Sequence, residues 1–351
     1  MKIIIDAMGG DNAPKQIVLG AIEGAIEHDV NIVLVGNESI IRDIAAKHSL
    51  CIDGNDKIEI VHTEGVITME DSALSVVRDK RDSSMGVGLK MLAEGNGDAF
   101  VSAGNTGALH AGSSLLVRRI KGIQRSAIAT VLPFANPTLL IDSGANTEVE
   151  PSHLLQFGVM GSIYMNKVMK VENPRVGLLN NGTEETKGTK KLVEAYQVLK
   201  DADTINFIGN VEGKTLPYGE CDVIVTDGFT GNILLKSVEG LASYFMKTLK
   251  GIFMKNILTK LSSLITKKHL KNMKNTFDAS AHGGAPLLGL AKPVIKAHGS
   301  SDAKAIKNAI RQAKEFVSKG VINEIVDSLA ALSAKIDAEK AAISEESSNN
   351  G

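Results

Sequence analysis

Five glycine-bearing junctions are the places where this chain could do chemistry. Each follows a short apolar run and precedes a helical pattern: DAMGGDNAPK (6–15), SAGNTGAL (102–109), IDSGAN (141–146), NNGTEETKG (180–188) and VTDGFTGN (225–232). Glycine lets the backbone approach a ligand closely, and the free N–H groups of a first helical turn favour an anion. Capping alone can explain one such junction. Five in one chain favour a site for a phosphate-like anion.

We expect three of these junctions and one histidine to contact the anion. In open α/β sheets, ligands collect beyond the carboxyl ends of the strands, where loops meet helix N-termini. The expected substrate- or phosphate-binding residues are Asp6, Gly9, Gly10, Ser102, Gly104, Asn105, Thr106, Gly107, Asp227, Gly228, Thr230, Gly231 and His298. For His298 a capping or core role is the alternative, because Ser300, Ser301 and Asp302 already make a plausible helix start.

The reaction that suits such a site is one in which the bound anion is the nucleophile. The sequence has no Gly-x-Gly-x-x-Gly after its first strand, no His-Glu-x-x-His and no Gly-x-Ser-x-Gly, and GNVEGKT (209–215) has one spacer residue too few for a P-loop. Phosphate attacking an acyl thioester needs only placement and a donor for the developing oxyanion. Lys187 and Asn232 could supply these, although a solvated lysine near a helix start is the alternative for Lys187.

Composition excludes several other classes. The 351 residues carry a net charge of -1, which disfavours nucleic-acid binding. No cluster of Cys, His, Asp or Glu at ligand spacing accompanies the junctions, so we expect neither a metal nor an organic cofactor. Cys51 and Cys221 form no disulfide framework, and the run Ile3–Ile5 is too short for a signal peptide, so we expect a cytosolic protein.

The elements that must position these residues are those of an α/β protein. Apolar runs alternate with helical patterns at Ile3–Ile5, Asn31–Val35, Ile58–His62, Ala99–Ser102, Ala127–Leu132, Thr138–Ile141, Arg175–Leu179, Thr204–Ile208 and Asp222–Thr226. The pattern predicts a central sheet covered on both faces. The two runs around Asn136-Pro137 predict a hairpin and hence a mixed sheet. After the last run we expect only helices, with one α/β domain over 1–335 and a helix end and disordered tail over 336–351.

The segment from about 240 to 277 is predicted to be an amphipathic helical protrusion. It has no Asp or Glu from Gly240 to Phe277 but eight lysines, and an apolar stripe repeats every four residues at Leu249, Phe253, Ile257, Leu261 and Ile265. Lysines interrupt it too often for a transmembrane span. We expect it to pack against the same segment of a second copy in a homodimer. We also expect it to rest on an anionic membrane surface through Met254, Leu258 and Leu261. Dimer packing without membrane contact is the alternative.

These motifs resemble those of a known family. In order and spacing, DAMGGD, SAGNTGAL, VTDGFTGN, GGAPLLGL (283–290) and HGSSD (298–302) are similar to the bacterial phosphate acyltransferases of phospholipid synthesis, to about residue 330. The resemblance implies transfer of a long-chain acyl group from acyl carrier protein to orthophosphate, giving acyl phosphate for the glycerol-3-phosphate acyltransferase that follows. It also implies a homodimer and a three-layer α/β/α fold like that of isocitrate and isopropylmalate dehydrogenases and phosphotransacetylases.

The resemblance also bears on single residues. The family's catalytic lysine and asparagine, in the loops matching GTEETKG and GFTGN, fall on Lys187 and Asn232. The chain departs from the family at Asn12, where His is common, and at His282, where Tyr is common.

The resemblance further implies a docking surface for an acidic carrier protein, which should be locally basic. VRRIKGIQR (117–125) is the candidate, through Arg118, Arg119, Lys121 and Arg125, with a solvated helix end as the alternative. Two other functions stay open: a phosphotransacetylase-like enzyme using short acyl-CoA, which needs no lysine-rich surface, and a membrane-surface adaptor, which would leave five intact junctions without a role.

Overall fold

One mixed sheet runs through the molecule. The computed structural model describes residues 1–52, 54–276 and 283–331. Its strands are β1 (Lys2–Asp6), β2 (Asn31–Gly36), β3 (Ile58–His62), β4 (Ala99–Ser102), β5 (Ala127–Pro133), β6 (Pro137–Ile141), β7 (Arg175–Asn180), β8 (Asn206–Glu212), β9 (Val223–Val225), β10 (Ala285–Leu288) and β11 (Val294–Lys296). They form an 11-stranded sheet in the order β3-β2-β1-β4-β11-β10-β5-β6-β9-β7-β8.

The sheet is parallel in both halves and antiparallel in the middle. β1 pairs in parallel with β2 and β4, and β9 pairs in parallel with β6 and β7. The predicted hairpin at Asn136-Pro137 is confirmed, because β5 and β6 are antiparallel with Pro133 opposite Pro137. The predicted mixed sheet is therefore correct.

The expectation that only helices follow residue 226 is wrong. β10 and β11 form an antiparallel pair, with Pro286 opposite Ile295, and they lie between β4 and β5 at the centre of the sheet. These strands have only four and three residues, and proline lies within one and directly before the other. A proline argues against a central strand when a sequence is read alone, so tertiary burial decides their conformation.

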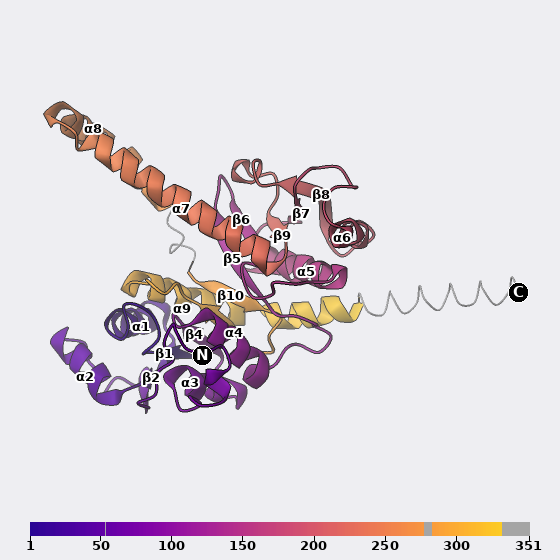
Figure 1. The fold of residues 1–351 in the computed structure, drawn as a ribbon. Helices are drawn as coiled ribbons and strands as arrows, with labels where there is room; N and C mark the ends of the chain where they lie inside the picture. The colour runs from indigo at the N-terminus through magenta and orange to yellow at the C-terminus, as the bar shows by residue number, and fades with distance from the viewer. Residues whose placement is uncertain (53, 277–282, 332–351) are drawn as a thin grey trace, which may run out of the picture.

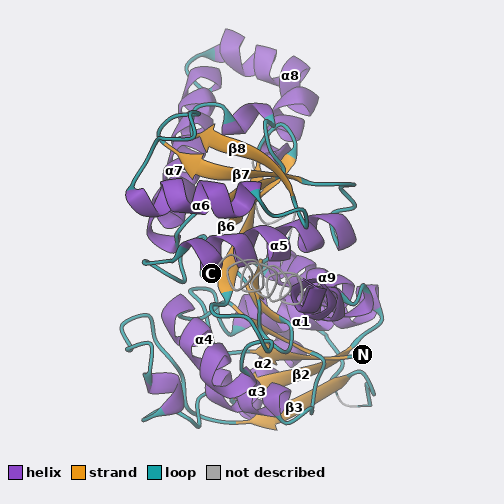
Figure 2. Cartoon of the chain, turned by 90° about the vertical axis from the view of Figure 1, so that its right-hand side faces the viewer, coloured by secondary structure: helices purple, strands orange, loops and turns teal. Residues whose placement is uncertain are grey.

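Helices cover both faces of the sheet, as predicted. They are α1 (Lys15–His28), α2 (Glu38–Lys47), α3 (Ser84–Ala93), α4 (Thr106–Gly112), α5 (Pro151–Lys167), α6 (Lys190–Lys200), α7 (Gly228–Phe253), α8 (Ile257–Thr276) and α9 (Ala303–Ser318), with short turns η1 (Ser75–Val77), η2 (Ser113–Val117) and η3 (Leu216–Tyr218). Residues 321–331 are also helical. Figure 2 shows α5 and α9 at the level where the two halves meet.

Alternate residues of each strand enter separate cores. Ile3 and Ile5 pack in the cluster that contains α1 and α9, whereas Ile4 packs with α3 and α4 on the other face. In the second half, Leu139 packs against the α5 side and Leu140 against the α7 side. A strand buried on both faces is read as a continuous apolar run, which is why these strands could be predicted.

The protrusion predicted over 240–277 consists, up to residue 276 where the description stops, of two helices. α7 continues beyond the body of the molecule and α8 folds back beside it (Figure 1). Asn256 starts α8: its Oδ1 accepts the N–H of Thr259 at 2.9 Å, while its own N–H donates to Thr259 Oγ1 at 3.0 Å. The predicted stripe is therefore divided by this turn. The side chain of Ile265, like residues 336–351, lies outside the described residues.

Candidate active site

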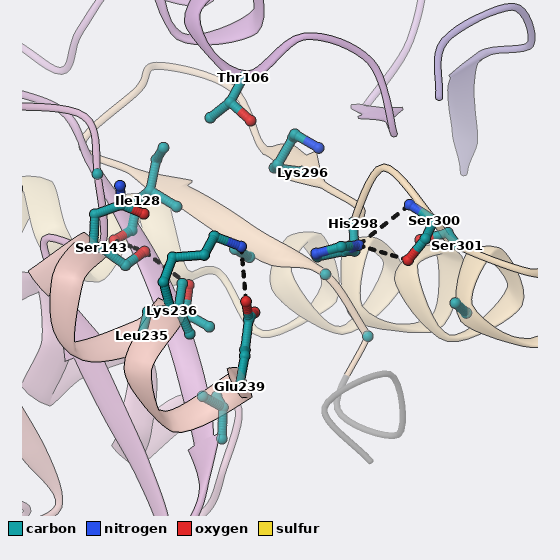
Figure 3. A pocket seen from close by; sticks show the side chains of 18 of the residues that line it. Thr106, Ile128, Ser143, Leu235, Lys236, Glu239, Lys296, His298, Ser300 and Ser301 are labelled. Carbon is teal, nitrogen blue, oxygen red and sulfur yellow. Dashed lines mark hydrogen bonds and ion pairs between the residues drawn. The ribbon is translucent and has the colours of Figure 1, made fainter. Parts of the chain in front are cut away.

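A cavity of about 690 Å³ lies where the two halves of the sheet meet. Residues of β5, β11, the first turns of α7 and the loop before α9 line it, and α4 contributes Thr106. Figure 3 shows Lys296 and His298 along one wall, and Lys236 and Glu239 of α7 along another. Of the predicted site residues, this cavity brings together Thr106, Asn232 and His298.

The start of α7 positions Asn232. Asp227 caps the helix, accepting the Thr230 N–H at 2.8 Å and the Thr230 hydroxyl at 2.7 Å. The N–H of Gly228 donates to the carbonyl oxygen of Asn146 at 2.7 Å, which joins this turn to the IDSGAN loop. Asn232 then lies beside Gly144, exposed to the cavity, and its amide makes no hydrogen bond to any described residue. A free amide at this position can donate to an incoming anion or oxyanion.

Lys296 is a charged residue of this cavity that the sequence did not lead us to expect. It ends β11, only 9% of it is exposed, and its Nζ donates to the carbonyl oxygens of Ala103, at 3.4 Å, and Ala297. Burial lowers the pKa of Lys296 to about 8. The only signal in the sequence was a lysine directly after Val294-Ile295, and it was lost because β11 was not predicted.

His298 belongs to a loop that Asn12 holds in place. The Nδ1 of His298 accepts the N–H of Ser300 at 3.2 Å and lies 2.9 Å from the Ser300 hydroxyl. Asn12 Nδ2 donates to the carbonyl oxygens of Ser300, at 2.9 Å, and Ser301, at 3.3 Å. Asn12 therefore ties the first junction to the HGSSD loop, while His282 lies outside the described residues.

The carboxylate of Asp6 links the first two junctions through hydrogen bonds. It is 1% exposed, and its carboxylate accepts the hydroxyls of Ser84 and Ser102, each at 2.6 Å. Burial raises its pKa, against the opposing effect of these hydrogen bonds. A Cβ on Gly9 would lie 2.4 Å from the Asp6 carboxylate, so glycine is required there by close packing. Asp6 and Ser102 thus position the turn and lie outside the lining of the cavity.

The second and third junctions also use polar groups of their own. Asp142 is fully buried and accepts the N–H groups of Gly144 at 3.0 Å and Asn146 at 2.7 Å. Asn105 caps α4 through the N–H of Ala108 at 3.0 Å, while its Nδ2 donates to the carbonyl oxygen of Thr68 at 3.2 Å. Capping and loop closure therefore explain much of the glycine and asparagine at these junctions.

Lys187 lies in a loop whose next residues, Gly188 and Thr189, line a different hollow from the one that Asn232 lines. The lysine is exposed, and its carbonyl oxygen accepts from Asn180 Nδ2 at 3.0 Å. Its neighbour Gly188 lines a second hollow of about 700 Å³, together with Asp227 and Thr230. Lys187 itself lines neither hollow, and nor do these predicted residues: Asp6, Gly9, Gly10, Ser102, Gly104, Asn105, Gly107, Gly228 and Gly231.

The four basic residues predicted to bind the carrier protein are all exposed: Arg118, Arg119, Lys121 and Arg125. They follow η2, and none forms an ion pair with a residue that the structure describes. Within the same described ranges, no three or more His, Cys, Asp or Glu residues gather where they could hold a metal ion.

Solved structures of other proteins share this fold. The architecture is that of the phosphotransacetylases: the enzyme from Streptococcus pyogenes has a TM-score of 0.64 at 17% identity, covering 90% of this chain and 94% of that one. The phosphotransacetylase from Staphylococcus aureus has a TM-score of 0.59 at 17% identity, covering 90% of this chain and 94% of that one. At this identity the likeness shows the fold alone.

The sequence comparisons show the family. A family model described as "fatty acid synthesis protein" matches residues 1–324. The phosphate acyltransferase of Alkaliphilus oremlandii is 49% identical over 333 residues, covering 95% of this chain and 98% of the relative. The phosphate acyltransferase of Thermoanaerobacter pseudethanolicus is 48% identical over 332 residues, covering 94% of this chain and 97% of the relative. The chain belongs to this fatty acid synthesis protein family.

Proposed function

We propose that this chain, a phosphate acyltransferase of fatty acid and phospholipid synthesis, transfers a long-chain acyl group from acyl carrier protein to inorganic phosphate in the main cavity. The observation that carries the proposal is the free amide of Asn232 at the wall of this cavity. Nearly full-length identity to phosphate acyltransferases supports the same reaction.

The chemistry is an acyl substitution. A phosphate oxygen attacks the thioester carbonyl carbon, a C–O bond forms, and the C–S bond breaks as the tetrahedral oxyanion collapses and the thiolate leaves. In our proposal, Asn232 donates a hydrogen bond to the phosphate or to the oxyanion, and Lys187 supplies positive charge. Lys187 lines neither hollow, so in our proposal its exposed side chain moves to the bound phosphate to contribute.

The carrier protein is proposed to dock on the basic surface of Arg118, Arg119, Lys121 and Arg125. The support is that these side chains are exposed, that no described carboxylate neutralises them, and that the segment follows the SAGNTGAL helix. Opposite charge across such a surface would mainly accelerate encounter and select the partner.

We further propose that the chain acts as a homodimer in the cytoplasm, at the inner face of the membrane, where it passes acyl phosphate to a glycerol-3-phosphate acyltransferase. The exposed apolar side chains at the tip of the α7–α8 hairpin support the membrane contact: Met254 is 55% exposed, Leu258 78% and Leu261 54%. Within the described residues, no helix combines the length and hydropathy needed to cross a bilayer.

The deciding assay supplies the purified protein with inorganic phosphate and a long-chain acyl-acyl-carrier protein, and measures acyl phosphate and free carrier thiol. Parallel reactions contain acetyl-CoA or butyryl-CoA. Faster turnover of the short acyl-CoA would favour the phosphotransacetylase-like alternative, and no phosphate-dependent reaction with any donor would reject the enzyme. We expect activity to survive EDTA, and a loss that Mg²⁺ reverses would overturn that expectation.

A further inference from the structure

Lys296 is a buried cation without an anionic partner. Its Nζ donates only to backbone carbonyl oxygens, and in the part of the chain that the structure describes no carboxylate lies within ion-pair distance of it. The other lysine of the same cavity, Lys236, is satisfied by Glu239 at 2.7 Å. An ammonium group removed from water without a counter-ion is costly, so its position favours an anion that arrives from outside.

None of the charged groups around Lys296 that the structure describes forms an ion pair with it, so an anion could take that place. Burial has the largest effect and lowers the pKa of Lys296; Asp11, in the turn after β1, and Asp6 on β1 raise it, and Lys236 on α7 lowers it. Asp6 is already occupied by two serine hydroxyls. Two other carboxylates line the cavity, and each already has a partner: Asp302 caps α9, and Glu239 forms an ion pair with Lys236. His298 also lines the cavity, in the same loop as Asp302.

We infer that Lys296 binds the phosphate that attacks the thioester, a role distinct from those assigned to Lys187 and Asn232. The inference rests on the proposed function, and it deepens it by naming the residue that holds the nucleophile. Lys296 sits in the same cavity as Asn232, whereas Lys187 lies outside that lining. An ammonium group and a free amide that line one cavity can hold one phosphate and leave an oxygen toward the acyl group.

Lys296→Met tests the inference through the substrate constants. We expect the KM for phosphate to rise roughly 10- to 100-fold, the size of effect of losing a charge-assisted hydrogen bond, with the KM for acyl-acyl-carrier protein changed by less than about threefold. Lys236→Met is the matched control, because it removes a paired lysine from the same cavity, and its phosphate KM should change far less. Equal effects of the two variants would mean that only the overall charge of the cavity matters, and would overturn the assignment.

The pH dependence supplies a second test. In the wild type, phosphate affinity should fall above about pH 8 as the Lys296 ammonium loses its proton. Lys296→Arg keeps its charge, so its phosphate affinity should stay level from about pH 7.5 to 9.5, where inorganic phosphate is already mostly the dianion. If the phosphate affinity of Lys296→Arg falls with pH as that of the wild type does, the titrating group is not Lys296.

Calorimetry with inorganic phosphate alone separates this inference from the proposed function. At about pH 8.5, in buffers of different ionisation heat, wild-type binding should take up part of a proton, Lys296→Met should abolish the uptake, and His298→Gln should retain it. Binding without proton uptake by the wild type, or uptake lost with His298, would overturn the inference even if the variants of Lys296 fail to fold. If phosphate binds as expected but acyl-acyl-carrier protein is not consumed, the proposed function fails and the phosphate site stands.

Discussion

The carbonyl oxygen of Asp142 occupies the space where a side chain on Gly231 would begin: a Cβ there would lie 1.9 Å from it. The first turn of α7, and with it Asn232, is thus packed directly against the IDSGAN loop. We expect Gly231→Ala to lower the free energy of unfolding and to reduce turnover, because the helix must move away from the loop.

Gly240→Ala is the matched control, since a Cβ on that glycine of α7 meets nothing within 4 Å. It should leave turnover unchanged and stabilise the protein by about 0.5–1 kcal/mol, the helix-propensity difference between the two residues. Urea unfolding and steady-state kinetics measure both variants. If Gly231→Ala is as stable and active as Gly240→Ala, the close approach does not matter.

Asn232→Ala and Lys187→Ala should remain folded and lose most activity. Each removes one donor from an oxyanion or phosphate, which typically costs roughly 10²–10³ in rate. Acyl phosphate formation under saturating substrates is the measurement, and unchanged thermal unfolding is the control. A variant that keeps more than about a third of wild-type turnover would remove that residue from the mechanism.

Lys296→Met should make the protein more stable while it weakens phosphate binding. The folded pKa of Lys296, about 8, lies below the 10.5 of the unfolded chain, so the unfolded state binds more protons between these values and wild-type stability rises with pH there. The variant's advantage should therefore be largest at neutral pH, up to ~3 kcal/mol, and shrink above about pH 8. Urea unfolding at about pH 7 and 9.5 tests this, and an advantage that grows with pH would contradict it.

Charge reversal at Arg118 and Arg119 should raise the KM for acyl-acyl-carrier protein and leave that for phosphate unchanged. The effect should weaken as salt rises, because exposed charges are screened. The matched control reverses two exposed lysines elsewhere, Lys47 and Lys319. An equal rise in both Michaelis constants would point to misfolding.

Leu258→Glu should reduce co-sedimentation with vesicles that contain phosphatidylglycerol. Leu258 is 78% exposed at the hairpin tip, and a charge there opposes entry into the membrane interface. Ile26→Glu is the control, because Ile26 is 62% exposed on α1, away from the hairpin. Wild-type binding should also fall at high salt. If the wild type never binds, or neither salt nor Leu258→Glu matters, the hairpin has no membrane role.

The sequence predicted the parts of the fold that local pattern controls. Strands such as β1 are buried on both faces and read as apolar runs, and the glycine-bearing junction before α7 indicates a helix start locally, whereas the turn at Asn256 that divides α7 from α8 was not predicted. β10 and β11 could not be found, since each depends on partners more than 150 residues away. The same limit concealed Lys296, and it concealed the hydrogen bonds of Asp6, because only the fold brings Ser84 and Ser102 to its carboxylate.

The central position of β10 and β11 has a consequence for synthesis on the ribosome. Residues 99–102 and 127–133 are made early, yet the sheet cannot join them until residues 285–296 have emerged, because β11 pairs with β4 and β10 with β5. Such distant pairing slows folding and leaves strand edges open in the meantime. We therefore expect nascent chains that end before residue 285 to hold two unjoined half-sheets, each with an edge available to chaperones.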